Sequence, residues 1–140
     1  LVSARGVELS ADTQWDSGGR MRGSVSYQDV TLSNDHHPAN SPQCLGKLNL
    51  AQPLPWAGLS LGYELRYDAK RLAIDSSELH GYWLSNINLI AGRLARGLEA
   101  SVGIYNLFNQ RYQHPGSDTN WQTRLDQDGR SVRAKLDYRF

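Results

Sequence analysis

The chain has 140 residues, with 15 Lys and Arg against 14 Asp and Glu, and a mean hydropathy of −0.56. The nearly balanced charge gives no electrostatic reason to expect nucleic acid as a partner. No window approaches the roughly 18 consecutive apolar residues of a membrane helix, whereas a membrane-crossing strand needs only about 9–11 residues with one apolar face. The single cysteine, Cys44, excludes an intrachain disulfide and a multi-cysteine metal site.

Alternation of apolar and polar residues recurs along the whole chain, while helical periodicity is nearly absent. A period of two is typical of strands with one apolar face. The clearest example is SVRAKLDYRF at 131–140, where every position obeys the alternation. The pattern predicts about seven strands, each near the length of a membrane-spanning strand. In chain order they lie at 5–15, 21–30, 44–53, 59–70, 81–92, 98–112 and 131–140.

The connections between these segments alternate between short and long. The short ones are rich in Gly or Pro and lie at 16–20, 53–58 and 93–97, and the long polar ones lie at 33–43, 71–80 and 113–128. In an antiparallel meander this order places every short turn at one end and every long loop at the other, as in outer-membrane barrels. We therefore predict an all-β fold, an antiparallel up-and-down meander.

Aromatic residues gather toward both ends of the predicted strands. Near the short turns these residues are Trp15, Trp56, Tyr138 and Phe140, and near the long loops they are Tyr27, Tyr67, Trp83 and Tyr112. Two aromatic girdles around an aliphatic band favour a membrane-embedded barrel. A soluble β-sandwich or a lipocalin-like barrel would also alternate, with its charged face in solvent, and this alternative stays open.

Three segments carry a resemblance to a known family: GVELSADTQW at 6–15, YNLFNQRY at 105–112 and DGRSVRAKLDYRF at 128–140. Together they resemble the C-terminal barrel region of TonB-dependent outer-membrane receptors, which include siderophore, haem and cobalamin receptors. The resemblance extends over essentially all of the chain.

The resemblance implies that residues 1–140 are the C-terminal segment of a transmembrane barrel of about 22 strands in the bacterial outer membrane. The plug domain and the earlier strands would be absent from this chain. The whole receptor would import a scarce nutrient, above all a ferric siderophore, with energy from the TonB complex acting on the missing plug region. It implies no enzymatic activity and no cofactor. A segment of a porin or adhesin barrel is the alternative.

The strand count points to missing strands independently of the resemblance. Single-chain bacterial barrels have an even number of strands, whereas seven are predicted here. The chain also begins without Met or a signal peptide, so we expect a processed chain or a fragment. The strands at 5–15 and 131–140 would each leave one edge unpaired, and the isolated fragment would be prone to dimerise through these edges.

Four residues near the long loops are predicted to bind ligand: His36 and His37 in the first long loop, and Arg66 and Lys70 at the upper end of the lumen. A cationic mouth would attract an anionic ferric chelate. The alternative is that the histidines are solvated and that the cations pair with wall or plug residues. No metal site is expected, because adjacent histidines point in different directions. No catalytic residue is expected, because no nucleophile lies in a recognisable motif.

Two further groups of residues are predicted to have structural roles. Within the first group, Phe108 and Tyr112 would anchor at the membrane interface while Asn106 and Asn109 satisfy the backbone, so we predict a structural motif of Asn106, Leu107, Phe108, Asn109 and Tyr112. The second group would face outer-membrane lipid. By resemblance it is also the signal read by the barrel assembly machinery: Val132, Ala134, Leu136, Tyr138 and Phe140.

Overall fold

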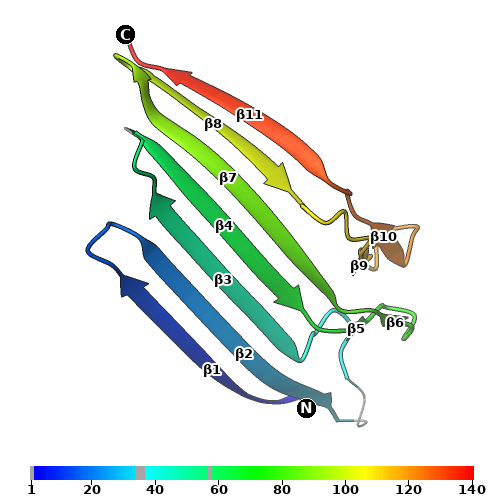
Figure 1. Ribbon diagram of the computed structural model, residues 1–140. Helices are drawn as coiled ribbons and strands as arrows, with labels where there is room; N and C mark the ends of the chain where they lie inside the picture. The colour runs from blue at the N-terminus through cyan, green and yellow to red at the C-terminus, as the bar shows by residue number, and fades with distance from the viewer. Residues whose placement is uncertain (1, 34–36, 57) are drawn as a thin grey trace.

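The computed structural model describes residues 2–33, 37–56 and 58–140, and these form an all-β structure (Figure 1). Seven strands form one sheet: β1 (Val2–Gln14), β2 (Arg20–Leu32), β3 (Cys44–Pro53), β4 (Leu59–Asp68), β7 (Tyr82–Ala95), β8 (Leu98–Tyr105) and β11 (Ser131–Tyr138). Two small hairpins pair β5 (Arg71–Leu72) with β6 (Glu78–Leu79), and β9 (Gln113–Pro115) with β10 (Arg124–Asp126). Within these described ranges no helix is long and apolar enough to cross a bilayer.

The order of the strands in the sheet follows their order in the chain, and every pair is antiparallel. The predicted meander is therefore confirmed. The short turns lie at one end of the sheet and the long loops with the two hairpins lie at the other (Figure 1). We call the latter the loop end. Strands β1 and β11 each have a partner on one side only, so each presents a free edge.

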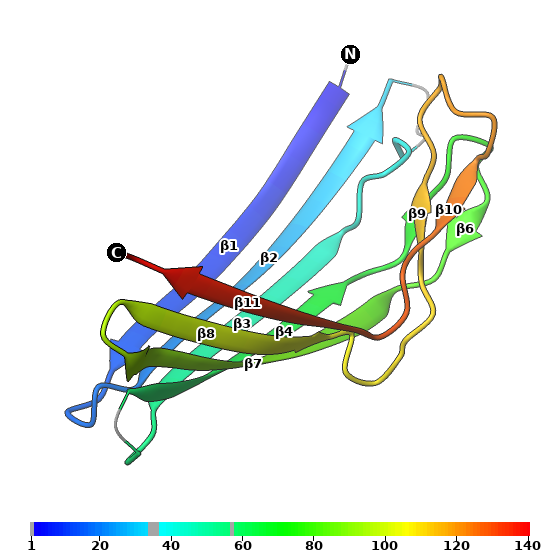
Figure 2. The ribbon, with the colours of Figure 1, turned by 90° about the horizontal axis from the view of Figure 1, so that it is seen from above.

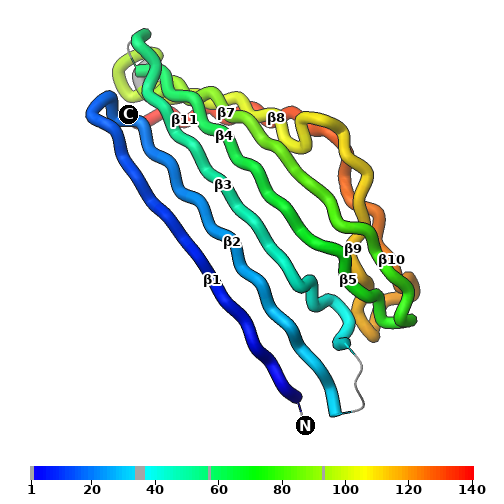
Figure 3. The backbone as a smooth tube through the Cα atoms, turned by 60° about the horizontal axis from the view of Figure 1, so that its bottom comes forward, coloured from blue at the N-terminus to red at the C-terminus, as the bar shows by residue number. Residues whose placement is uncertain are grey.

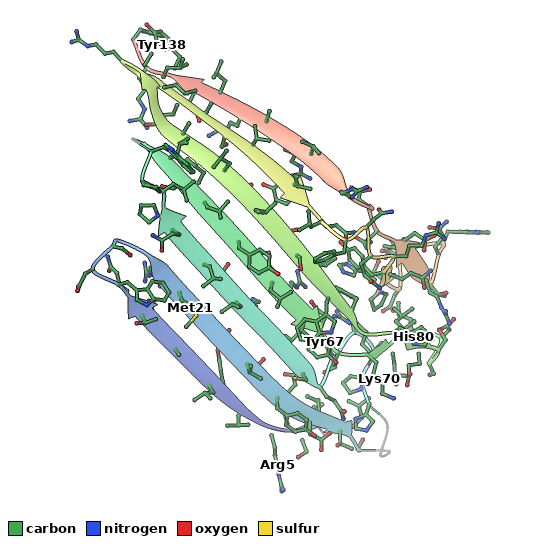
Figure 4. All side chains as sticks on the ribbon, in the orientation of Figure 1. Arg5, Met21, Tyr67, Lys70, His80 and Tyr138 are labelled. Carbon is green, nitrogen blue, oxygen red and sulfur yellow. The ribbon has the colours of Figure 1, made fainter. Side chains whose placement is uncertain are left out.

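The register places the alternating residues of all seven strands on two consistent faces. Residues directly opposite each other in an antiparallel pair lie on the same face. One such row, crossing five strands of the apolar face, consists of Leu9, Val25, Gly46, Tyr67 and Trp83. The opposite face is polar, as shown by Asp12, which accepts hydrogen bonds from Arg20 and Arg22 of β2. Two apolar-face residues, Met21 and Tyr67, are labelled in Figure 4.

The sheet is a single curved layer, and the described residues form no second sheet packed on it (Figures 2 and 3). A compact protein of this mass exposes about 7,300 Å², whereas this chain exposes 10379 Å². The buried apolar residues are Ala73, Leu79 and Tyr82, all at the loop end. The apolar face is thus left uncovered by the described chain, which contradicts the alternative of a β-sandwich.

The structure differs most from the predicted strands at the end of β8, and the other strand bounds differ by at most three residues. Strand β8 stops at Tyr105, so the expectation that it continues to residue 112 is wrong. Asn106 and Asn109 adopt left-handed φ angles of 51° and 54°, which end the extended backbone. Strand β7 instead runs on to Ala95, because an irregular register between Ala91 and Ala95 takes up residues expected in the turn.

The hairpins β5–β6 and β9–β10 lie inside loops that the sequence pattern left without structure. Their strands have two or three residues each, too few for alternation to be recognised. Both hairpins stand together at the loop end, as Figure 2 shows. The buried Ala73 and Leu79 belong to the β5–β6 hairpin and Tyr82 begins β7, so this part of the loop end is folded around a small core of its own.

Candidate functional site

A buried carboxylate organises the loop end of the polar face. Asp68 is the last residue of β4 and is only 1% exposed. Arg66, two residues earlier and therefore on the same face, donates from Nε to Asp68 at 2.5 Å. Arg71 of β5 donates to the other carboxylate oxygen at 2.5 Å, and also to Asn40 at 3.2 Å. These bonds join the end of β4, the β5–β6 hairpin and the loop before β3.

Aromatic residues extend this arrangement to the longest loop. Tyr82 lies directly opposite Asp68 and is 3% exposed. Its hydroxyl is 2.9 Å from Nε2 of His114, and its ring centroid is 4.4 Å from that of Tyr112. The guanidinium of Arg71 lies 5.9 Å from the centroid of the Tyr82 ring. We refer to this group as the mouth cluster, which consists of Arg66, Asp68, Arg71, Tyr82, Tyr112 and His114.

The mouth cluster, together with the adjacent Lys47, carries more positive than negative charge. Two arginines share the single carboxylate of Asp68. Lys47 of β3 is directly opposite Arg66 and makes no ion pair with the residues that the structure describes. Lys47, Arg66 and Arg71 exceed by one charge the carboxylates of Asp68 and of Glu64, which lies diagonal to Lys47, so this part of the polar face carries a net positive charge. Such a site attracts anions.

The structure brings two of the predicted ligand residues to one hollow. His37 and Lys70 line a space of about 250 Å³ together with Arg71. The Lys70 ammonium, near the loop end in Figure 4, is 2.8 Å from Glu78. His37 Nδ1 lies 2.9 Å from the carbonyl oxygen of Val30. Arg66 does not line this hollow and is connected to it only through Asp68 and Arg71. His36 lies outside the described residues.

A second, larger hollow lies beside the mouth cluster and was not predicted. Its volume is about 790 Å³, within the roughly 300–1,000 Å³ usual for ligand sites. The lining is mainly polar side chains: His80, Asn109, Gln110, Arg111, Gln113, Asp126 and Gln127. Sequence reasoning missed it because its walls come from 80–81, 109–113 and 126–129, which the β8–β11 loop brings together.

The asparagines of the 106–112 segment bond to the backbone on both sides of the long loop. Asn106, 6% exposed, accepts from the amide of Gln110 at 2.8 Å and donates to the carbonyl oxygen of Asp128 at 3.3 Å. Asn109 accepts from the amide of Arg130 at 2.9 Å. Phe108 is exposed, and Leu107 donates its amide to the Ser85 carbonyl oxygen. Tyr112 packs on Tyr82 within the mouth cluster.

The residues predicted as an assembly signal share the apolar face of β11. Val132, Ala134 and Leu136 lie opposite apolar-face residues of β8, and Tyr138 lies opposite Leu98. Phe140 follows the end of β11, with its ring centroid 6.2 Å from that of Tyr138. On the other face Lys135 pairs with Asp137 at 2.9 Å. A role in assembly stays a prediction. In the described ranges no group of three or more His, Cys, Asp or Glu residues could hold a metal ion.

We expect the β9–β10 hairpin to loosen as the pH falls below about 6.5, the ordinary pKa of histidine. Burial of His114, and next the charge of Arg71, lower the pKa of this imidazole. Since the pKa is then lower in the folded than in the unfolded chain, the contribution to stability is complete above the unfolded pKa. It is lost as the pH falls toward the lowered value. In the protonated imidazole both ring nitrogens are donors, so Nε2 can then only donate to the Tyr82 hydroxyl.

Amide hydrogen-exchange protection of residues 113–126, compared at about pH 7.5 and about pH 5.5 after correction for intrinsic rates, measures this effect. The full-length protein in a bilayer is the sample. In a His114→Gln variant, which cannot titrate, the protection should be the same at both pH values. Equal protection of the unaltered protein at both pH values would contradict the prediction.

Solved structures with the same fold are outer-membrane receptors and transporters. The ferripyoverdine receptor of the outer membrane of Pseudomonas aeruginosa matches with a TM-score of 0.78 at 17% identity, over 98% of this chain and 19% of its own. BauA, the ferric preacinetobactin receptor from Acinetobacter baumannii, matches with 0.81 at 20% identity, over 96% and 22%. The copper transporter OprC matches with 0.78 at 21%, over 99% and 24%. No protein-family model and no curated protein matches the chain.

Two of these structures are named as receptors for ferric chelates and the third as a copper transporter. The chain therefore has the fold of a segment of the barrel of this class of receptor, as its sequence resemblance predicted. It spans about a fifth of the length of the first two receptors named. The apolar face then corresponds to the outer wall of a barrel and the polar face, with the mouth cluster, to its lumen.

Proposed function

We propose that residues 1–140 form the C-terminal part of the barrel of an outer-membrane receptor that imports an anionic ferric chelate, a siderophore above all. The observation that carries the proposal is the unbalanced positive charge at the loop end of the polar face, on Lys47, Arg66 and Arg71. Two of the matching structures are named as receptors for ferric chelates, which supports the ligand class. Energy would come from the TonB complex acting on the part of the receptor that precedes this chain.

Lys47 would supply the positive charge that binds the anionic ligand. Arg66 and Arg71 are held by Asp68, whereas Lys47 has no carboxylate partner in the described chain, and its side chain is exposed. The hollow lined by Lys70 is less suited to an anion, because Glu78 neutralises that ammonium. His37 is tied back to β2 through Val30. A role in binding for His36, His37 or Lys70 therefore stays a prediction.

Uptake of iron by a strain that lacks the full-length protein tests the proposal. We expect the strain to lose growth on at least one anionic ferric chelate as its only iron source, and the intact gene to restore it. A Lys47→Gln variant should bind that chelate about tenfold more weakly, since a hydrogen bond to a charged group contributes about 1.5–3 kcal/mol. A Lys135→Gln variant, on the same face but paired with Asp137, is the control. Unchanged growth on every ferric chelate would overturn the proposal.

A further inference from the structure

The apolar face of the sheet is not evenly filled. A groove of about 380 Å³ crosses strands β1 to β4 and is lined almost entirely by apolar atoms. Its floor lies over Ala11, Gly23 and Gly46, the smallest residues in three consecutive strands of this face. Ala11 is directly opposite Gly23, and Gly46 is diagonal to it, next to the Gly23–Leu48 pair. The groove therefore runs obliquely across the strands.

The backbone does not require glycine at either position of the floor. Neither Gly23 nor Gly46 has a positive φ. A Cβ at Gly23 would meet Leu48 at 3.7 Å, and one at Gly46 would meet Tyr67 at 3.5 Å, both ordinary contacts. By contrast, a Cβ at Gly103 would lie 2.0 Å from Asn88. Glycine costs stability in a strand interior, and the backbone conformation does not require it at either of these positions. The structural consequence of the two glycines is the open groove.

The walls of the groove rise around this floor. Val25 and Leu48 border it from within the sheet. Toward the loop end it is closed by Tyr67 and Trp83, whose ring centroids are 4.4 Å apart. Aromatic pairs at this level are typical of membrane interfaces, where one end of the side chain is apolar and the other is wet. The groove thus runs from Ala11 and Gly23, each three residues from the short-turn end of its strand, to this aromatic pair near the loop end.

The chemistry of the groove selects hydrocarbon over a peptide. An occupying peptide would bury its amides against the apolar side chains of a sheet whose backbone groups, apart from those on the free edge of β1, are already paired, so those amides would lose their hydrogen bonds. Hydrocarbon has no such cost. A dry apolar cavity of about 150 Å³ already holds one benzene molecule, and this groove is more than twice as large.

We propose that this groove is a binding site for one acyl chain of a membrane lipid, which lies across Gly23 and Gly46 against Tyr67 and Trp83. The inference rests on the proposed location of the barrel in the outer membrane. It goes beyond general contact with lipid, because it assigns a longer-lived lipid to one place on the wall. Strands β8 and β11, whose apolar face is lined by Ala100, Val102 and Leu136, lie outside the groove.

Photo-crosslinking in bilayers tests the site. The full-length protein would be reconstituted with a phospholipid that carries a photoactivatable group in its acyl chain, and the labelled residues would be mapped by peptide mass spectrometry. We expect labelling of residues 21–25 and 44–48 to exceed that of 100–104 and 132–136 by about tenfold, which corresponds to about 1.4 kcal/mol of preference.

Filling the groove should abolish this preference. In a Gly23→Leu, Gly46→Leu double variant the labelling should fall to the level of β8 and β11. The matched control, Ala100→Leu with Ala134→Leu, adds leucines to the same face outside the groove and should leave the preference intact. If the leucine variant does not assemble, Gly23→Ala with Gly46→Ala, whose added methyl groups make ordinary contacts, should reduce the preference in part.

Even labelling of all four segments in the unaltered protein would overturn the acyl-chain site and leave the proposed membrane location standing. Absence of label from every strand would overturn the membrane location and the site with it. Crosslinks from the groove to a second protein in place of lipid would overturn the assignment to hydrocarbon. None of these outcomes depends on uptake of a ligand, so failure of the proposed transport function is a separate result.

Discussion

Replacement of Asp68 with alanine will open the loop end of this chain while the seven-stranded sheet stays paired. Asp68 is almost completely buried and is the one carboxylate that both Arg66 and Arg71 contact. Its removal takes the carboxylate away from the largely buried guanidinium of Arg71, which keeps only its bond to Asn40 and its contact with Tyr82, whereas the Arg66 side chain is 41% exposed and is solvated. Breaking a buried ion pair in this way costs about 3 kcal/mol or more, or about a hundredfold in the local opening equilibrium.

Limited proteolysis from the loop side and hydrogen exchange of residues 69–81 would measure this opening in the full-length protein. Asp118→Ala removes an exposed carboxylate from the β8–β11 loop and should change neither, since no ion pair of the described chain includes Asp118. Asp68→Asn should be intermediate, because the amide oxygen can still accept from one arginine. Exchange of 69–81 at an unchanged rate in Asp68→Ala would contradict the assignment of Asp68 as the organising residue.

Arginine in place of Leu48, on the apolar face, should block assembly, whereas arginine in place of the next residue, Asn49, should be tolerated. Leu48 lies near the middle of β3 on the apolar face, and Asn49 lies on the polar face opposite Glu64. On the lipid side of a barrel, Arg costs about 2–4 kcal/mol at the bilayer midplane. Asn49→Arg instead faces the lumen and gains a carboxylate neighbour, so it should cost little.

The comparison is made on the full-length protein in membranes. Heat-modifiable migration on gels gives the folded fraction, and urea unfolding in vesicles gives the difference in free energy between the two variants. Equal loss of folding by Leu48→Arg and Asn49→Arg would show that the two faces do not meet different environments, and would contradict the orientation of the wall.

The sheet could be predicted from the sequence because its two faces meet different surroundings along the whole length of every strand. The alternation in 44–53 gives the bounds of β3, Cys44–Pro53. Prediction of the strand ends failed where side chains form hydrogen bonds with nearby backbone groups. The strand expected up to residue 112 ends at Tyr105, because Asn106 turns the chain and bonds to Gln110 and Asp128. The presence of Asn106 and Asn109 in the sequence does not by itself indicate such a turn.

The candidate site was predictable only in its location and sign of charge. Arg66 and Lys70 lie at the loop end, as expected from the strand ends. Their partners depend on loop conformation: Asp68 binds Arg71 as well as Arg66, and Glu78 reaches Lys70 across a hairpin of two-residue strands. Lys47 was missed as a candidate, because its importance comes from the register that places it opposite Arg66.

The strictly sequential order of the sheet has a consequence for how a disturbance spreads through it. Each strand of the main sheet has its principal contacts with its immediate neighbours, as in a repeat protein, so stability is a sum of local terms and a change at β1 decays before it reaches β11. The mouth cluster connects elements that are not neighbours in that order. Through Asn40, Arg71, Tyr82 and His114 it connects the loops that follow β2, β4 and β8. A ligand that displaces one of these loops would therefore also displace the other two, whereas a change in one short turn at the opposite end would not move the other short turns.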